Sequence, residues 1–247
     1  MKQSLRRVTL IGLTVAAASI AGIPSAAAQQ AEPANPDPFE GANRVVFAFN
    51  DSVDRFVLAP VARTYKTLTP SFARRGMGNF FANLYDLNGA LNAGLQGRFG
   101  NMAQNGGRFV VNSTVGMFGF VDVASEMGLN PYRTDFGHTL AIWGVDRGPY
   151  LMLPFFGPRT VRSAIGTSFD TVASLQWQVT DNTTRNWLFA AEIVDNRAAL
   201  TTAEGLITGD RYIFIRDAYL QQREYFVRGG VVEDSFSDFE DDFDWDE

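Results

Sequence analysis

The stretch FEGANRVVFAFNDSVDRF, residues 39–56, indicates the fold class of this chain. Its apolar residues return at alternating intervals of three and four, which places them along one side of a helix, whereas a strand would need an interval of two. They are Phe39, Ala42, Val46, Phe49, Val53 and Phe56. The spacing therefore predicts a long amphipathic helix after Pro38, with Asp37 as its N-cap and an end or a kink at Pro60.

The same helical period recurs along most of the chain. A second long helix, capped by Ser71, is predicted from Met77, Phe80, Leu84, Leu87 and Leu91, and Gly97 and Gly100 then break the chain. The chain continues with an apolar stretch at 109–115 and a short turn at 122–127. The helical period then returns at 161–172, 187–198 and 212–226. Between 131 and 158 glycine, proline and aromatic residues replace this period, so we expect loops, short helices or a hairpin there. We predict a mainly helical single domain.

The N-terminus resembles a secretory signal. Lys2, Arg6 and Arg7 precede a short apolar stretch at 8–23, and three alanines end at Ala28, before Gln29. We expect cleavage between Ala28 and Gln29, so that residues 1–28 are a signal peptide and residues 29–38 form an extended, proline-rich linker. Because the 247 residues contain no cysteine, we also expect an exported protein without disulfides and without a lipidated cysteine.

Charge is concentrated at the C-terminus. The chain has a formal net charge of −6, and its last 15 residues contain nine acidic residues and no basic one. We therefore predict a helical domain at 39–230 followed by an acidic, disordered tail at 231–247. No basic stripe is present that would favour a nucleic-acid partner.

The residues needed for catalysis are scarce. His138 is the only histidine, and no cysteine or G-x-S-x-G motif is present, so we expect no metal site, no cofactor and no catalytic triad. Asp135 lies three residues before His138 and could orient it, but a histidine in a loop is far more often a hydrogen-bonded side chain without a catalytic role. A secreted hydrolase that works through carboxylates, with Asp122 and Asp135 as candidates, is a further alternative, which would need two acids that converge in the fold. We expect a protein that is not an enzyme.

Phenylalanine is unusually abundant, at 21 of 247 residues. Aromatic stripes on helices usually fill a core, which is the more common interpretation. Phenylalanine-rich amphipathic helices can also lie in a bilayer interface, with the apolar face among the acyl chains. The sequence leaves both alternatives open.

A set of short motifs follows in a fixed order along the body of the chain. They are DPFE (37–40), NR (43–44), FAFN (47–50), NFFANL (79–84), LQG (95–97), RFVVN (108–112), Gly116, GFVDVA (119–124), DFGHTL (135–140), WG (143–144), GPY (148–150), PFFGP (154–158) and YIFIR (212–216). In this order the motifs resemble the MlaA (VacJ) family of Gram-negative outer-membrane proteins, from about residue 37 to 228.

The resemblance implies an all-α fold in which amphipathic helices form a ring-like single domain with a Gly/Pro-rich loop region. It further implies a channel in the inner leaflet of the outer membrane, in association with a trimeric porin. Family members remove phospholipid mislocalised to the outer leaflet and pass it to an MlaC-type periplasmic lipid carrier, which maintains lipid asymmetry. An alternative from another class is a periplasmic structural or adaptor protein that binds an envelope partner without moving lipid.

The candidate site residues are those of the family motifs, which either pack between helices or line the channel. They are Asn43, Arg44, Phe49, Asn50, Asn79, Phe80, Asn83, Gln96, Gly97, Arg108, Phe109, Asn112, Gly116, Gly119, Asp122, Asp135, Gly137, Trp143 and Gly144. Asparagine supplies uncharged donors and acceptors on otherwise apolar helices. Such side chains commonly bond between helices, and the alternative is that they face a wet channel that passes a lipid headgroup.

Overall fold

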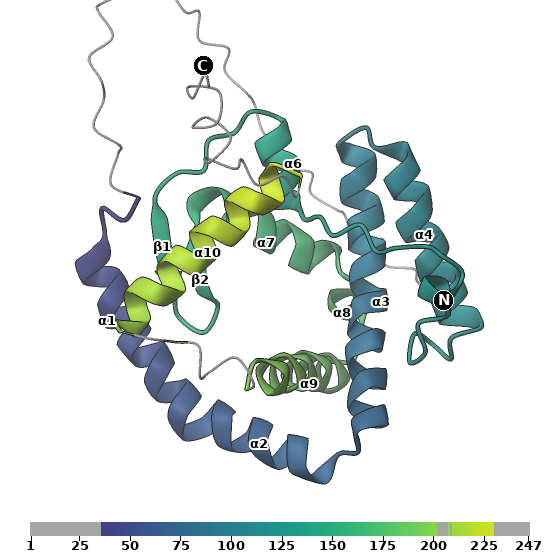
Figure 1. Cartoon of the computed structure of the whole chain (residues 1–247), viewed down its shortest axis with the longest axis horizontal. Helices are drawn as coiled ribbons and strands as arrows, with labels where there is room; N and C mark the ends of the chain where they lie inside the picture. The colour runs from purple at the N-terminus through teal and green to yellow at the C-terminus, as the bar shows by residue number, and fades with distance from the viewer. Residues whose placement is uncertain (1–35, 202–206, 208, 230–247) are drawn as a thin grey trace, which may run out of the picture. The chain divides into compact units, whose positions relative to one another are not determined.

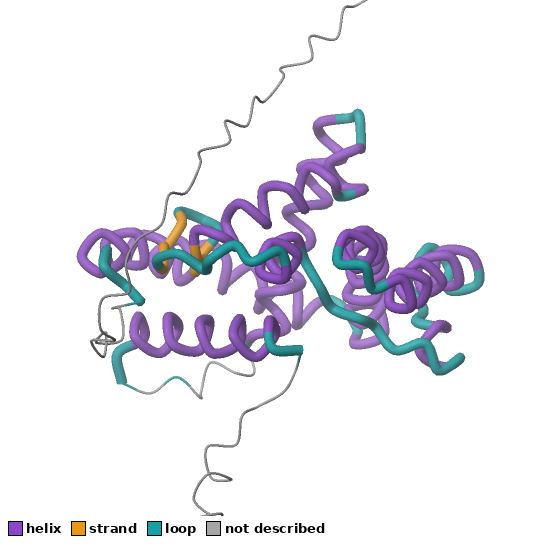
Figure 2. The backbone as a smooth tube through the Cα atoms, turned by 90° about the horizontal axis from the view of Figure 1, so that it is seen from above, coloured by secondary structure: helices purple, strands orange, loops and turns teal. Residues whose placement is uncertain are grey.

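A computed structural model of the chain describes residues 36–201, 207 and 209–229. The predicted signal peptide with its cleavage site at Ala28 and Gln29, the linker up to residue 35 and the acidic tail at 231–247 lie outside these residues. Figure 2 shows that helix makes up most of the described backbone and that the strands form one small hairpin. The predicted mainly helical fold is confirmed.

The N-terminal helix consists of three consecutive sections, α1 (Glu40–Val53), the π-helical turn η1 (Asp54–Leu58) and α2 (Ala59–Leu68). The sequence predicted an end or a kink at Pro60, and the helix does not end there. In a regular α-helix the proline ring collides with the carbonyl four residues earlier. Here the turn before Pro60 is wider, and the N–H of Ala59 bonds to the carbonyl of Asp54, five residues back. The wider turn lets the helix continue through the proline.

The N-cap prediction for Asp37 is wrong. Phe39 occupies the N-cap position of α1, and no side chain caps the helix. Asp37 is 1% exposed, and its carboxylate accepts a hydrogen bond from Asn43 Nδ2 at 2.7 Å and another from the hydroxyl of Tyr212. Its carboxylate therefore ties the start of the domain to a helix near the end of the chain.

Helices α3 (Ser71–Leu95) and α4 (Phe99–Thr114) pack against each other. Ser71 was predicted to be the N-cap of α3. The N-cap is instead Pro70, and Ser71 is the first residue of the helix. Gly97 has a φ of +71° and ends α3, as expected. Gly100 lies inside α4, which is longer than the predicted stretch 109–115.

The middle of the chain contains short elements. Asp122 caps α5 (Val123–Glu126), Asp135 caps α6 (Phe136–Ile142), and a hairpin follows. Strands β1 (Tyr150–Leu153) and β2 (Gly157–Thr160) pair antiparallel, with Tyr150 opposite Thr160 and Leu153 opposite Gly157. The expectation of short helices or a hairpin in this region is therefore confirmed.

The last helices are α7 (Val161–Ala173), α8 (Leu175–Gln178), α9 (Asn182–Leu200) and α10 (Arg211–Val227). Within the domain that begins at Pro36, contacts join elements that are distant in sequence: β1 lies on α1, α10 lies on β2 and α6, α6 lies on α3, and α9 lies on α2 and α3. Figure 1 lets the reader follow this closed circuit of contacting elements from α1 through α10 and α3 back to α2.

Polar side chains occupy much of the interior of these contacts. The buried polar or charged residues include Asn43, Asn83, Asp86, Asn88, Asn92, Asn105, Arg108, Asn112, His138, Thr139 and Glu192. Six of the buried hydrophobic residues are alanines, and a small cluster of Tyr150, Met152, Tyr212 and Leu220 is the main larger apolar core. The described helices are therefore held together largely by hydrogen bonds and small residues.

Large apolar side chains lie on the outside. Of the apolar stripe that predicted the first helix, Phe39, Ala42, Phe49 and Phe56 are exposed and Val46 and Val53 are half-buried, whereas the buried residue of α1 is Asn43. Among the phenylalanines of the described residues, Phe81 is buried at 3% exposure. In the described part of the chain, no helix is both long and apolar enough to cross a membrane.

Candidate functional site

Two asparagines of α1 hold the β-hairpin. Asn43 donates from Nδ2 to the carbonyl of Tyr150 at 3.2 Å, and its Oδ1 accepts from the N–H of Met152 at 2.9 Å. Asn50, two turns later, pairs in the same way with the carbonyl of Leu153 and the N–H of Phe155, both at 2.9 Å. A side-chain amide thus replaces the strand partner that the free edge of β1 lacks. Both asparagines bond between elements.

Arg44 and Phe49 extend this junction between α1 and the rest of the domain. Arg44 pairs with Glu40 at 2.7 Å and with Asp210, the N-cap of α10, at 2.9 Å. Its guanidinium carbon also lies 4.5 Å from the ring centre of Tyr212. Phe49 is 45% exposed and contacts the ring of Phe155 edge-on at 5.2 Å.

Asparagines of α3 contact the end of α4 and the loop after it. Asn79 Nδ2 donates to the carbonyl of Phe120 at 3.1 Å, and Asn83 Nδ2 donates to Ser113 Oγ at 2.9 Å. A Cβ on Gly119, whose φ is +93°, would lie 2.8 Å from Asn83, and one on Gly116 would lie 2.2 Å from the carbonyl oxygen of Val121. The two glycines therefore allow the close approach of this loop. Phe80 packs on the ring of Phe120, with centroids 5.8 Å apart.

Arg108 is the centre of a buried charged network on α4. It is 3% exposed, donates from Nε to Asp86 at 2.9 Å, and donates from Nη2 to both carboxylate oxygens of Asp122 at 3.2 Å. Asn112 donates to Asp122 at 3.0 Å and accepts from the N–H of Ala124 at 2.9 Å. Burial raises the pKa of Asp86, which the charge of Arg108 opposes. Burial acts in the same direction at Asp122, but hydrogen bonds led by those from Ser125 and Asn112 lower its pKa overall.

Most of the remaining motif residues lie near the ends of α3 and α6. Gln96 donates from Nε2 to Thr134 at 2.7 Å and to Thr139 at 3.0 Å. Trp143 is 53% exposed and donates from its indole to the carbonyl of Leu95 at 3.3 Å. Gly144 ends α6 with a φ of +84°, and Phe109 is half-buried on α4.

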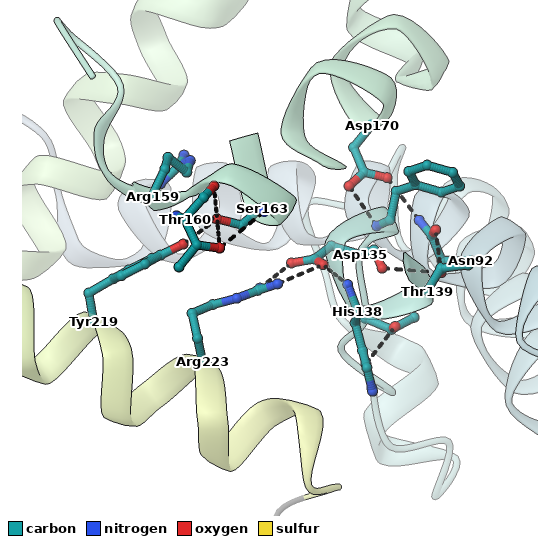
Figure 3. Close-up of polar contacts among 12 residues, drawn as sticks. Asn92, Asp135, His138, Thr139, Arg159, Thr160, Ser163, Asp170, Tyr219 and Arg223 are labelled. Atoms are coloured by element: carbon teal, nitrogen blue, oxygen red, sulfur yellow. Dashed lines mark hydrogen bonds and ion pairs between the residues drawn. The ribbon is translucent and has the colours of Figure 1, made fainter. Parts of the chain in front are cut away.

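Asp135 belongs to a cluster in which α3, α6, α7 and α10 meet (Figure 3). Its carboxylate caps α6 by accepting from the N–H of His138 at 2.7 Å, and it receives both terminal nitrogens of Arg223 from α10. Burial would raise the pKa of Asp135, but hydrogen bonds and charge from Arg223 lower it overall. A Cβ on Gly137 would lie 2.9 Å from Arg223, so the glycine leaves space for the guanidinium.

Asp170 on α7 completes the cluster. It accepts from the N–H of Phe136 at 2.9 Å and from Asn92 Nδ2 at 2.8 Å, and Asn92 Oδ1 in turn accepts from Thr139 at 2.9 Å. Burial raises the pKa of Asp170 to about 6, against the opposing effect of these hydrogen bonds. On the other side of Arg223, Ser163 and Tyr219 share a hydrogen bond of 2.6 Å, as Figure 3 shows.

His138 does not have the arrangement that a catalytic triad requires. It is 2% exposed, and its ring Nδ1 lies 3.1 Å from Thr134 Oγ1, while Asp135 bonds to its backbone N–H. The sequence suggestion that Asp135 orients the His138 ring is therefore wrong. Burial lowers the pKa of His138, which favours the neutral ring. Within the described residues no group of acidic or histidine side chains could hold a metal ion.

The motif residues thus form several separate interhelical networks, and the sequence could not show their partners. Asp37, Asp170 and Arg223 supply essential contacts but were not singled out as candidates. Each of them has a partner at least 34 residues away in sequence, and Tyr212, a partner of Asp37, lies 175 residues away. Regular spacing reports neighbours on one helix, so such pairs leave no local signal.

These features define a class of protein: a helical domain with hydrogen-bonded polar residues between its helices and large apolar side chains outside. That distribution is typical of proteins that work in contact with lipid. The MlaA lipoprotein family model matches residues 35–226. The chain belongs to this family, which confirms the resemblance of the motifs.

Individual relatives agree with this assignment. The chain is 36% identical to the intermembrane phospholipid transport system lipoprotein MlaA of Escherichia coli (strain K12) over 203 residues, which cover 79% of this chain and 80% of the relative. It is 34% identical to an uncharacterized protein of Rickettsia typhi over 78% of each chain. A solved structure, described as "Structural basis for maintenance of bacterial outer membrane lipid asymmetry", matches with a TM-score of 0.69 at 34% identity, over 77% of this chain and 98% of that chain.

Family membership corrects one expectation. From the absence of cysteine we predicted a protein on the periplasmic side of the outer membrane, exported by a cleaved signal peptide and attached without a lipidated cysteine. The matching family is described as a lipoprotein, and the MlaA relative of Escherichia coli is named as one. The prediction of attachment without lipidation is therefore wrong. It rested only on the absence of one residue type from the sequence, which does not determine how a protein is anchored.

Proposed function

We propose that this protein moves phospholipid at the outer membrane and so maintains the lipid asymmetry of that membrane. It takes phospholipid mislocalised to the outer leaflet and passes it towards the periplasm. The names of the MlaA relatives and the description of the matching structure support the proposal. The observation on this chain that carries it is the outward orientation of the apolar stripe of α1, with Asn43 buried on the other side.

The exposed phenylalanines would be costly in water. Phe56, Phe118 and Phe155 are 76%, 78% and 75% exposed, and each fully buried phenylalanine contributes about 1.5–3 kcal/mol relative to an exposed one. A bilayer interface supplies the apolar surroundings that the fold itself does not supply to these side chains. The alternative in which the aromatic stripes fill a core is not supported for the stripe of α1.

Lipid transport requires that the acyl chains be kept away from water. Exposing two acyl chains of about 16 carbons to water costs on the order of 25 kcal/mol, at about 0.8 kcal/mol per methylene. A phospholipid therefore needs shelter at each step of its path. We infer that the exposed apolar side chains of α1, η1 and α2 contact acyl chains during this step.

The partners that the resemblance implies are part of the proposal. A trimeric porin would hold the protein in the membrane, and an MlaC-type periplasmic carrier would receive the lipid. Exposed apolar residues such as Phe156 and Trp187, at 63% and 71%, supply contact surface of the kind that protein interfaces use. The channel expected from the resemblance remains a prediction, as does the choice between channel and packing roles for Phe109 and Trp143.

We also propose that the protein catalyses no reaction. Support comes from His138, which is 2% exposed, and from Asp122 and Asp135, which bind Arg108 and Arg223 in separate networks. The acids therefore do not converge as the hydrolase alternative requires. If the protein were a hydrolase that used Asp122 and Asp135, substitution of either aspartate would abolish hydrolysis even in a variant that still folds.

Lipid co-purification distinguishes transport from the adaptor alternative. The protein is purified in mild detergent from native membranes, and bound phospholipid is quantified by mass spectrometry. Transport predicts phospholipid that stays with the protein and passes to purified MlaC-type carrier when the two are mixed. An adaptor that binds only a protein partner would carry no phospholipid above the level of a detergent-treated control protein.

A further inference from the structure

Glu192 of α9 is a buried acid that forms no ion pair within the described part of the chain. It is 6% exposed, and each of its two carboxylate oxygens accepts a hydrogen bond from an uncharged donor. The donors are the hydroxyl of Tyr85 from α3 and Nε2 of Gln176 from α8, the latter at 2.7 Å. A carboxyl group that accepts on both oxygens has the hydrogen-bond pattern of the ionised form. The place where α9 contacts α3 and α8 (Figure 1) therefore holds a negative charge without a cation among the described residues.

Arg159 of β2 is a cation in the complementary situation. Its side chain is half-buried, its Nη1 donates to the carbonyl of Pro158 at 2.8 Å, and its Nε is buried without a hydrogen-bond partner among the described residues. No carboxylate of those residues forms an ion pair with it. Since a guanidinium group is planar and carries several donors, its unused donors suit the oxygens of a phosphate.

Tyr85 links these two charged groups. Burial and the charge of Glu192 raise the pKa of the Tyr85 hydroxyl, and the charge of Arg159 acts in the opposite direction. Both charges therefore lie within electrostatic range of one hydroxyl. Although this hydroxyl bonds to the buried Glu192, Tyr85 is 55% exposed. The ring thus extends from solvent to the carboxylate, and an aromatic face of this kind also attracts ammonium groups.

Another buried charge in the domain is compensated by the protein itself. Asp86 of α3 is 7% exposed and pairs with Arg108 at 2.9 Å. A buried charge is costly unless it is paired, and Glu192 and Arg159 both lack such a partner among the described residues. A ligand that carries an ammonium group and a phosphate would supply both missing partners at once.

We propose that Glu192, Tyr85 and Arg159 form a binding site for a zwitterionic phospholipid headgroup, which carries an ammonium group and a phosphate. The ammonium group lies against the carboxylate of Glu192 and the ring of Tyr85, and the phosphate pairs with Arg159. The inference rests on the proposed function, because phospholipid is the ligand class of that function. It adds a preference among headgroups, since a lipid without an ammonium group would leave the charge of Glu192 uncompensated.

The test uses the full chain in detergent and three probes. The first is dihexanoyl phosphatidylethanolamine, and the second is the same lipid with its amine acetylated, which keeps the phosphate but has no ammonium group. The third is phosphoethanolamine, which has both charges but no acyl chains. The variants are Glu192→Gln, Arg159→Gln and Tyr85→Leu, and the matched controls Glu126→Gln and Arg133→Gln each remove one exposed charge elsewhere. Circular dichroism and denaturation midpoints establish which variants fold.

The wild-type chain and the controls should bind dihexanoyl phosphatidylethanolamine at least about tenfold more tightly than its acetylated form. This preference should disappear in Glu192→Gln, because the charge that selects the ammonium group is gone. Arg159→Gln should instead weaken the binding of both lipids by about tenfold, because both carry the phosphate. Tyr85→Leu changes an exposed side chain that faces the ammonium group and should reduce the preference, which keeps the test decisive if Glu192→Gln does not fold.

Equal binding of the two lipids by the wild-type chain would overturn the inference but leave the proposed function intact. A preference that survives unchanged in the folded variants of Glu192 and Tyr85 would have the same consequence. Binding of phosphoethanolamine as tightly as the lipid would show a site for a soluble zwitterion and also overturn the inference. Failure of the wild-type chain to bind either lipid would contradict the proposed function itself.

Discussion

The carboxylate of Asp135 on α6 binds both terminal nitrogens of Arg223 on α10, across 88 residues of sequence. The same carboxylate caps α6, so one side chain fixes both the start of α6 and the position of the last helix. At its other end α10 is held by the hydroxyl of Tyr212, which donates to Asp37. Helix α10 is thus fixed at two positions, Tyr212 and Arg223, by partners at the start and near the middle of the domain sequence.

Substitution of Arg223 by Gln should lower the free energy of unfolding by about 2 kcal/mol, because a partly buried carboxylate loses its cation. The side chain of Arg223 is 15% exposed and that of Asp135 is 38% exposed, so the loss should stay below that of a fully buried pair. The change in the free energy of unfolding is measured by urea denaturation, monitored by circular dichroism. Arg228→Gln, which breaks an exposed pair with Glu224, should change stability by less than about 0.5 kcal/mol. Equal effects of the two substitutions would contradict the role given to Asp135.

Asn43→Asp tests the asparagine that replaces a strand partner. The change removes the Nδ2 donor to Asp37 and Tyr150 and places a second carboxylate beside the buried Asp37. We expect a loss of about 2–3 kcal/mol in unfolding free energy at pH 7. The loss should shrink as the pH falls towards 4, where the carboxylate introduced at position 43 becomes protonated. A loss that does not depend on pH would show that repulsion from Asp37 is not its cause.

Two glycine-to-alanine substitutions should have opposite signs. A Cβ on Gly166 of α7 would lie 2.3 Å from the backbone nitrogen of Gly137, so Gly166→Ala should force α6 and α7 apart and destabilise the fold by more than about 2 kcal/mol. A Cβ on Gly106 of α4 meets nothing within 4 Å, and Gly106→Ala should stabilise by up to about 1 kcal/mol. The midpoint temperatures of thermal unfolding of the two variants and the wild type test both predictions. Similar midpoints for the two would contradict the close packing of α6 on α7.

Asp170 should make stability depend on pH in the acidic range. Its folded pKa of about 6 is raised above the ordinary aspartate value, so the folded state binds the proton more tightly than the unfolded state. Its contribution to stability is therefore fully present below about pH 4 and is lost as the pH rises through about 6. In Asp170→Asn this falling component should be absent. The measurement is the difference between the unfolding free energies of the variant and the wild type from pH 4 to pH 7, and a flat difference would contradict the raised pKa.

The sequence predicted helices where local spacing alone determines them. The stripe from Phe39 to Phe56 and the stretch after Val161 both gave helices close to their observed bounds. Spacing identified the apolar side of α1 but not its direction, since a stripe has the same period whether it faces a core or lipid. Only the fold shows that Asn43 lies inside and Phe56 outside.

The errors have one physical cause in common. Asp37 was assigned to capping because a cap is a local interaction, whereas its carboxylate bonds to the side chains of Asn43 and of Tyr212, which is 175 residues away. Of the two outcomes predicted at Pro60, an end of the helix is wrong, and the π-turn that accommodates the proline was not foreseen because it is a backbone adjustment without a residue signature. The grouping of the motif residues into separate networks depends on contacts between distant segments, which spacing along one helix does not report.

The exposed phenylalanines should affect lipid contact more than stability. Phe56→Ser with Phe155→Ser should reduce flotation of the protein with phospholipid vesicles about tenfold, because two large apolar contacts are lost. The unfolding free energy should change by less than about 1 kcal/mol, since both side chains are already exposed. Phe81→Ser, at a residue that is 3% exposed, should instead destabilise by about 3–5 kcal/mol. Unchanged flotation of the double variant would contradict the assignment of this surface to lipid.

The most direct measurement is the amount of phospholipid in the outer leaflet of the native host after deletion of the gene. We predict that surface-exposed phospholipid rises, that the cells become sensitive to detergent with chelator, and that re-expression of this chain reverses both effects. Outer-leaflet phospholipid that stays at the wild-type level in the deletion strain, with an intact barrier, would contradict the proposal that the protein maintains lipid asymmetry.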